Sequence, residues 1–247
     1  MALSSEDRTA AMAFHTTHWS VVMAARGQDE STAAREALAS LCSSYWNPLY
    51  SFIRRQGYNP QEAEDLTQGF FCNILERNSL KNVAQPAGKF RSFLLTCLKH
   101  FLINEREKAH AQRRGGGHAI IPLEIDLAET HYALEPADNV TPEALYEKRW
   151  ALTVLEHTTN ALEREYAAQN KKDVFAELKG FLPGGQGGES RADFAARRGI
   201  SAGAVDVAIH RLRQRFGALL RQEVAQTVSS EAEMDEEIRY LISIVAN

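Results

Sequence analysis

Residues 190–216 read SRADFAARRGISAGAVDVAIHRLRQRF. Phe194 and Ala195 indicate a first helix, and Gly199 follows where a tight turn needs a positive φ. Ser201 can cap a second helix, and Ile200 is expected to fill the space between the two helices. The inward face of the second helix is predicted to be Val205, Ile209, Leu212 and Phe216. Two helices joined by three residues predict a DNA-binding helix-turn-helix, although such pairs also occur as plain packing units.

The outward face of that second helix carries the residues that DNA binding would use. Arginine can pair bidentately with guanine or hold a phosphate, and Asp206 can accept a hydrogen bond from cytosine. Small residues at the start of the helix allow close approach to the bases. The candidate DNA-contacting residues are Ser201, Ala202, Gly203, Ala204, Asp206, Val207, His210, Arg211 and Arg213.

Basic and acidic residues are concentrated in separate segments of the chain. The 247 residues carry 28 Lys and Arg against 32 Asp and Glu, a net charge of −4. Residues 89–114 and residues 191–221 each hold seven basic and two acidic residues. Residues 118–147 hold seven acids and no Lys or Arg, and residues 227–247 hold five acids and one Arg. A single charge run is usually a solvated face, but two matched basic blocks on predicted helices indicate nucleic-acid binding.

The periodicity of the apolar residues predicts an all-α fold. Helices are expected over residues 33–55, with a kink or short break at Asn47-Pro48, and over 60–77, 89–112, 142–169 and 172–181. The length fits two small helical domains joined by a flexible acidic linker. The predicted layout is an N-terminal extension over 1–32, a first domain over 33–117, the linker over 118–141, a helix-turn-helix domain over 142–226 and an acidic amphipathic tail over 227–247.

Two helices of the first domain carry candidate contact residues. Between residues 88 and 114, phenylalanines alternate with cations, a pattern that suits capture of single-stranded nucleic acid. Leu94, Leu98 and Phe101 are expected in the core, and the exposed candidates are Phe90, Arg91, Lys99 and His100. The helix from residue 60 has an acidic, hydrogen-bonding face that suits a basic coiled-coil partner. Alternatively, these acidic residues are solvated and stabilise the helix start through its dipole. That face consists of Glu62, Glu64, Asp65 and Gln68.

Three stretches resemble the bacterial RNA polymerase sigma factors of the extracytoplasmic-function group. AEDLTQGFFCNILE (63–76) is similar to their helix that docks on the clamp coiled coil of the polymerase. FRSFLLTCLKHFLINEREKAHAQRR (90–114) is similar to their promoter-melting helix that reads the −10 element, and residues 190–216 are similar to their helix-turn-helix that reads the −35 element. The −10 contacts that the resemblance implies are Lys89, Phe90, Arg91, Lys99, His100, Asn104, Arg106 and Lys108.

The resemblance implies the partners and the activity. The partners would be core RNA polymerase, at its clamp coiled coil and flap, and promoter DNA, with an anti-sigma factor or the chain's own C-terminal tail as further candidates. The acidic linker would follow the path of the RNA through the polymerase. The tail could equally be a plain packing helix. The alternative hypothesis is a helix-turn-helix regulator that binds duplex operator DNA without polymerase.

Other function classes find little support in the sequence. We find no catalytic constellation, no phosphate-binding loop and no metal-ligand spacing, so we predict no enzyme, no cofactor and no metal site. The sequence contains no apolar stretch of 18 residues, so no membrane span is predicted. The cysteines Cys42, Cys72 and Cys97 lie far apart in helical patterns, which favours buried reduced thiols and a cytoplasmic location.

Overall fold

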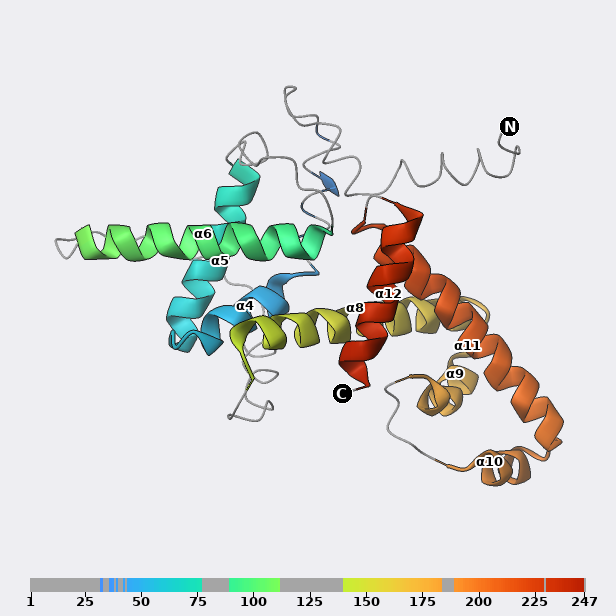
Figure 1. The fold of residues 1–247 in the computed structure, drawn as a ribbon. Helices are drawn as coiled ribbons and strands as arrows, with labels where there is room; N and C mark the ends of the chain where they lie inside the picture. Colours follow the sequence, from blue (N-terminus) through green and yellow to red (C-terminus); the bar gives the residue numbers. More distant parts are fainter. Residues whose placement is uncertain are drawn as a thin grey trace, which may run out of the picture. The chain divides into compact units, whose positions relative to one another are not determined.

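The described part of the chain is all-helical. The computed structural model describes residues 32, 36, 37, 39, 42, 44–76, 89–111, 140–183, 189–228 and 230–246, and within these ranges the regular structure is helical (Figure 1). This confirms the predicted all-α class. Residues 1–31, the acidic linker up to residue 139 and the Gly-rich stretch 184–188 lie outside the described residues, so the predictions made for them stay predictions.

The chain divides into two compact units. Unit 1 comprises residues 1–153 and 225–247, and unit 2 comprises residues 154–224. The divisions therefore fall inside α8 (Pro142–Ala168) and at the end of α11 (Ala202–Ala225) rather than at the predicted residues 142 and 226. The first turns of α8 group with unit 1 because Tyr146 packs edge-on against Phe52, with ring centroids 6.5 Å apart, and donates a hydrogen bond to Arg91 O at 2.9 Å.

In unit 1, α4 (Trp46–Arg55) begins next to the Asn47-Pro48 pair. Ser44 and Tyr45 form a turn, so the chain breaks before Trp46 instead of kinking at the proline. Pro48 then lies in the first turn of α4, where backbone N–H groups have no partner within the helix. The sequence therefore predicted the break correctly, but three residues later than it occurs.

The next two helices of unit 1 have the predicted bounds to within a residue. α5 (Pro60–Glu76) starts with a capping box, in which Asn59 Oδ1 accepts from the Glu62 N–H at 2.9 Å and Glu62 Oε2 accepts from the Asn59 N–H at 3.0 Å. α6 (Phe90–Ala111) buries Leu94 and Leu98 as predicted, and it also buries Phe93. Phe101 of α6 is half-buried and meets Phe70 of α5 edge-on, with ring centroids 5.7 Å apart.

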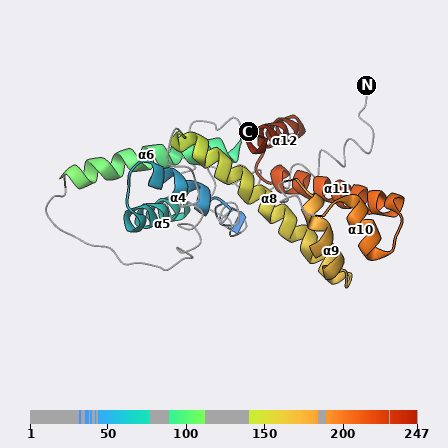
Figure 2. The same ribbon diagram turned by 90° about the horizontal axis from the view of Figure 1, so that it is seen from below.

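The C-terminal tail forms α12 (Glu231–Val245), which belongs to unit 1. Ser230 caps it by accepting from the Glu233 N–H at 3.2 Å. Figures 1 and 2 both show α12 beside the N-terminal end of α6. Met234 and Leu241 are buried, as an amphipathic tail predicts, whereas the neighbouring Ile242 is 56% exposed.

Unit 2 contains the end of α8, then α9 (Lys172–Leu178), the 3-10 turn η2 (Lys179–Phe181), α10 (Arg191–Arg198) and most of α11. Thr141, at the chain position before α8, caps that helix through the Ala144 N–H at 3.1 Å, as its Thr-Pro-Glu start predicts. The paired α9 and η2 confirm the helix predicted over 172–181.

The cysteines differ from expectation in one case. Cys42 is buried, and burial raises the pKa of its thiol to about 12. Cys97 is half-buried and burial raises its pKa to about 11. Cys72 is exposed, so the prediction of three buried thiols is wrong for this residue, which lies on the outer side of α5.

Candidate nucleic-acid interface

α10 and α11 are joined by three residues in the conformation that the sequence predicts. Ser190 caps α10 by accepting from the Asp193 N–H at 3.2 Å, and Gly199 has φ 63°, in the left-handed region. Ser201 Oγ accepts from the Ala204 N–H at 3.2 Å and so caps α11. The predicted inward face is confirmed, because Val205, Ile209, Leu212 and Phe216 are all buried.

Ile200 does not fill the space between the two helices. Its side chain is 43% exposed, so this prediction is wrong. Its backbone N–H continues the turn by donating to Ala195 O at 3.1 Å. Phe181 of η2 instead lies edge-on to Phe194 of α10, with ring centroids 6.0 Å apart. Phe181 lies outside residues 190–216, so the sequence pattern of that stretch does not indicate this contact.

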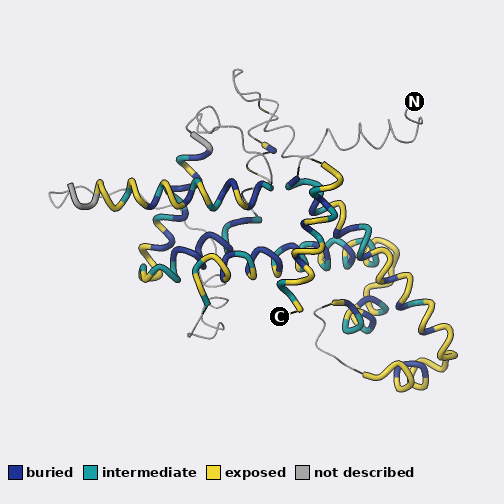
Figure 3. Tube along the Cα trace, viewed as in Figure 1, coloured by how far each residue is buried: buried dark blue, intermediate teal, exposed yellow. Residues whose placement is uncertain are grey.

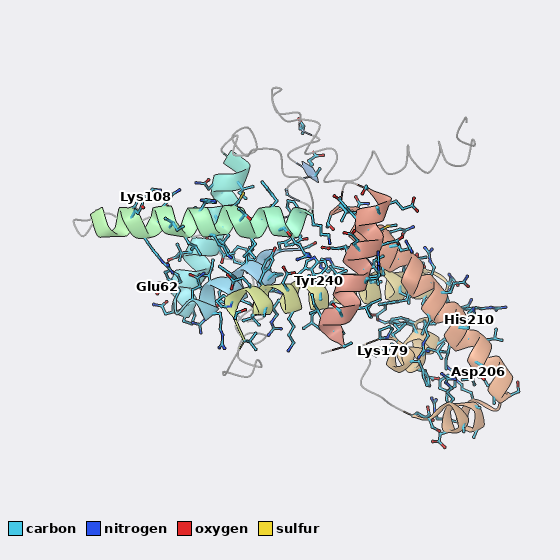
Figure 4. The ribbon with its side chains drawn as sticks, viewed as in Figure 1. Glu62, Lys108, Lys179, Asp206, His210 and Tyr240 are labelled. Carbon is cyan, nitrogen blue, oxygen red and sulfur yellow. The ribbon has the colours of Figure 1, made fainter. Side chains whose placement is uncertain are left out.

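The predicted contact residues of α11 are all exposed (Figure 3). Figure 4 labels Asp206 and His210 on this helix. The exposed set runs from Ser201 to Arg213 and includes Val207, which is 49% exposed. Gly203 has open space around the position that a Cβ would take. The first turns of α11 therefore present a surface of small residues followed by His210 and Arg211.

Most arginines near this surface already form ion pairs or hydrogen bonds with acceptors within unit 2. Arg191 pairs with Asp206 at 3.1 Å, and Arg215 pairs bidentately with Glu165 at 2.5 and 2.8 Å. Arg213 Nε donates to Phe181 O at 2.9 Å. Asp206, a predicted base contact, is therefore tied to Arg191 of the preceding helix.

Arg197 and Arg198 of α10 are paired as well. Arg197 contacts Glu189 at 2.7 Å and Arg198 contacts Glu177 at 2.6 Å. The hydrogen bond from Arg198 lowers the pKa of Glu177, and that from Arg197 lowers the pKa of Glu189. Among the described residues, Arg211 has no ion-pair or hydrogen-bond partner for its side chain. Arg211 is therefore the arginine of α11 that is most available to a ligand.

In unit 1, the start of α6 is covered. Phe90 is fully buried, and its ring meets that of Tyr45 edge-on with centroids 5.1 Å apart. Arg91 is 7% exposed and pairs with Glu147 of α8 and Glu237 of α12. The prediction that Phe90 and Arg91 are exposed is therefore wrong, because α12 and α8 supply the partners that the local pattern does not show.

The later turns of α6 remain accessible. Lys99 and His100 are exposed as predicted, and Lys99 pairs with Glu143 at 2.7 Å, a hydrogen bond that lowers the pKa of the Glu143 carboxyl. Asn104 is exposed too. Arg106 is exposed but donates to Tyr58 Oη and Gln56 Oε1, both at 2.8 Å, and Lys108 pairs with Glu105 at 2.7 Å. Lys89 is half-buried and contacts Glu237 at 2.9 Å.

Ile103 is an exposed apolar residue of α6 that the sequence pattern did not indicate. It is 51% exposed and shares the stripe of Lys99 and His100, one turn further along α6. The spacing of four from Lys99 could have identified it, but an isoleucine in an apolar helix reads as core.

The acidic face of α5 is smaller than predicted. Glu62 and Asp65 are exposed and Gln68 is half-buried, but Glu64 is only 1% exposed. Burial raises the pKa of Glu64, whose Oε1 accepts from Gln68 Nε2 at 2.9 Å. Glu62 belongs to the capping box, which bears out the reading of this carboxylate as part of the helix start. Figure 4 shows Glu62 at the start of α5 and Lys108 near the far end of α6.

Metal sites and membrane spans are not found in the described ranges. No group of three or more His, Cys, Asp or Glu in them is placed to hold a metal ion. Of the helices that the structure describes, none has the length and apolar character needed to cross a membrane. Comparison of the chain with protein-family models, with curated proteins and with solved structures gives no match.

Proposed function

We propose that the chain is a sigma factor of the extracytoplasmic-function type. It would bind core RNA polymerase, recognise the −10 and −35 promoter elements and promote DNA melting. Its action is binding, with no catalytic step by this chain. The proposal rests on the resemblance of three stretches and on the surfaces that these stretches form.

The observation that carries the proposal is the exposed face of α11. In the proposed helix-turn-helix, α11 is the recognition helix, and Ala202, Gly203 and Ala204 let it enter the major groove closely. His210 and Arg211 follow on the exposed side, where Arg211 can donate to guanine O6 and N7. Val207 can contact a thymine methyl group.

The later turns of α6 supply the second DNA surface of this proposal. Lys99 and His100 would hold the strand, and the exposed Ile103 offers an apolar contact for an unpaired base. The exposed carboxylates of Glu62 and Asp65 would face basic residues of the polymerase. Polymerase and the −10 strand would therefore be bound by two helices of the same unit.

The second candidate is a helix-turn-helix regulator that acts without polymerase. The burial of Phe90, Arg91 and Glu64 favours it, because a simple regulator has no need for an exposed Phe-rich basic helix or an acidic docking helix. Duplex DNA binding by α11 is common to both candidates, so DNA binding alone does not separate them.

Run-off transcription with core RNA polymerase of the same organism separates the two candidates. We expect promoter-dependent transcripts from genomic fragments and co-elution of the chain with the core enzyme. The variant Asp65→Lys should weaken co-elution, whereas Asp173→Lys, the same charge change at an exposed residue of α9, should not. Duplex binding without transcripts or co-elution would reject the sigma factor and leave the regulator.

A further inference from the structure

The N-terminal end of α6 is occupied by the chain's own tail. The Phe90 N–H donates to Thr227 O at 2.9 Å, just before α12. The Glu237 carboxylate of α12 accepts from Arg91 Nε at 2.5 Å, from Arg91 Nη2 at 3.2 Å and from Lys89 Nζ at 2.9 Å. One buried carboxylate, 1% exposed, thus takes three charge-assisted contacts from the first turn of α6.

Arg91 is enclosed on its other sides. Its guanidinium lies 4.4 Å from the ring centroid of Tyr240 on α12 and 5.0 Å from that of Trp150 on α8. Figure 4 labels Tyr240 on α12. Glu147 of α8 also pairs with Arg91, through Nη1 at 2.5 Å. The two cations of this cluster are therefore paired at close range with two carboxylates, Glu147 of α8 and Glu237 of α12.

Removal of α12 would change this balance. Lys89 and Arg91 would keep one carboxylate, Glu147, and the first turn of α6 would become net positive. Lys89 Nζ and the Nε and Nη2 of Arg91 would lose their acceptor, Glu237, together. A guanidinium beside an ammonium is a donor set that suits a phosphate group.

The attachment of α12 depends strongly on Glu237. The buried residues of α12 are Met234, Glu237 and Leu241, and Tyr240 adds a ring contact with Trp150, so Glu237 is the buried charged residue that attaches the helix. Glu236 is 62% exposed at its side chain and reaches Lys89 only at 3.9 Å. A competing anion for Lys89 and Arg91 would therefore weaken the main polar contact of the helix.

We propose that α12 is a removable cover over a phosphate-binding surface of unit 1, formed by Lys89, Arg91 and the first turn of α6. Glu237 occupies the place that a backbone phosphate of a nucleic-acid strand takes when α12 leaves. The inference rests on the proposed function, because that function supplies the strand. It adds that the part of the −10 surface at Lys89 and Arg91 is closed in the free protein and opens at the cost of the α12 contacts.

The test compares two charge-matched variants of the full-length chain. Binding of a labelled single-stranded DNA oligonucleotide is measured by fluorescence anisotropy for the wild type, Glu237→Gln and Glu236→Gln. We expect Glu237→Gln to bind at least about tenfold more tightly, because a larger fraction of molecules is open. Glu236→Gln should stay within about twofold of the wild type, since its contact is long and exposed.

A third variant shows whether the gain in DNA affinity depends on Lys89. Lys89→Gln added to Glu237→Gln should return the affinity to the wild-type value. Equal affinity of Glu237→Gln and wild type, or the same gain in Glu236→Gln, would overturn the proposal. Tryptophan fluorescence during thermal unfolding checks that each variant is folded, because Trp46 and Trp150 both lie in unit 1.

A measurement on the wild type does not depend on the variants folding. Amide hydrogen exchange of residues 231–245 should become faster when single-stranded DNA is bound. Unchanged exchange at saturation would overturn the proposal that α12 is a removable cover. Failure of the proposed function looks different. Tighter strand binding by Glu237→Gln without transcripts or co-elution with core polymerase would keep the cover and reject the sigma factor.

Discussion

The two basic blocks have the same net charge in the sequence, but the starts of their long helices, α6 and α11, differ in accessibility in the structure. In unit 2, the exposed turns of α11 carry His210 and Arg211 at the surface. In unit 1, the first turn of α6 is covered, and Arg91 is enclosed by carboxylates of α8 and α12. The contrast teaches that a charge count along the chain locates cations but not their accessibility, because distant segments can supply the counter-charges.

The largest expected difference between the two units is the loss of stability when a paired arginine is replaced by alanine. Arg91→Ala leaves Glu147 and Glu237 buried without their main partner, and we expect the free energy of unfolding of unit 1 to fall by about 3–5 kcal/mol. Arg191→Ala removes the Arg191–Asp206 pair, in which both side chains are more than half exposed, and should cost less than about 1 kcal/mol. Urea unfolding followed by tryptophan fluorescence for Arg91→Ala and by circular dichroism for Arg191→Ala measures both values. Equal losses would contradict the assignment of one buried and one exposed cluster.

The next difference concerns DNA affinity within α11. Arg211→Ala should weaken duplex binding by about 1–3 kcal/mol if Arg211 reads a base edge. Arg215→Ala should have a smaller effect, because Arg215 is held bidentately by Glu165. Titration of a labelled promoter duplex at several salt concentrations checks this. If both variants lose affinity uniformly across sequences with a reduced salt slope, the two arginines are phosphate contacts instead.

The smallest expected effect is a pH dependence confined to unit 2. The hydrogen bond from His157 to Glu223, at 3.1 Å, raises the pKa of His157 above 6.5. The pair therefore stabilises unit 2 fully below that ordinary pKa, and the contribution is lost as the pH rises through the raised pKa. Because His157 is 40% exposed, the loss should stay below about 1 kcal/mol. Urea unfolding at pH 6 and pH 8, with His157→Gln as the control that abolishes the difference, measures it; Arg91 in unit 1 stays charged over this range.

Much of the fold follows from local sequence. The left-handed Gly199 and the cap at Ser201 each depend on residues within one turn, and each was predicted. The buried face of α11 follows from helical spacing alone. For the same reason the exposed face, and with it the set of candidate DNA contacts, could be predicted.

The errors share a physical cause. Phe90, Arg91 and Glu64 were expected at the surface from their position on a single helix, but their burial is decided by other parts of the chain. The pairing of Arg91 with Glu237 spans 146 residues, and no local pattern indicates it. Ile200 is the opposite case, because it was expected between the two helices and is 43% exposed.

Duplex binding by two matched glycine variants of α11 tests whether its first turns enter a DNA groove. Gly203 and Gly217 both have open space where a Cβ would stand, so both substitutions to glutamate should preserve the fold. Gly203→Glu places a carboxylate on the proposed docking surface and should weaken duplex binding by at least about tenfold through repulsion from phosphates. Gly217→Glu, further along the same helix, should leave the affinity within about twofold. Equal affinities of the two folded variants would contradict the assignment of α11 as the recognition helix.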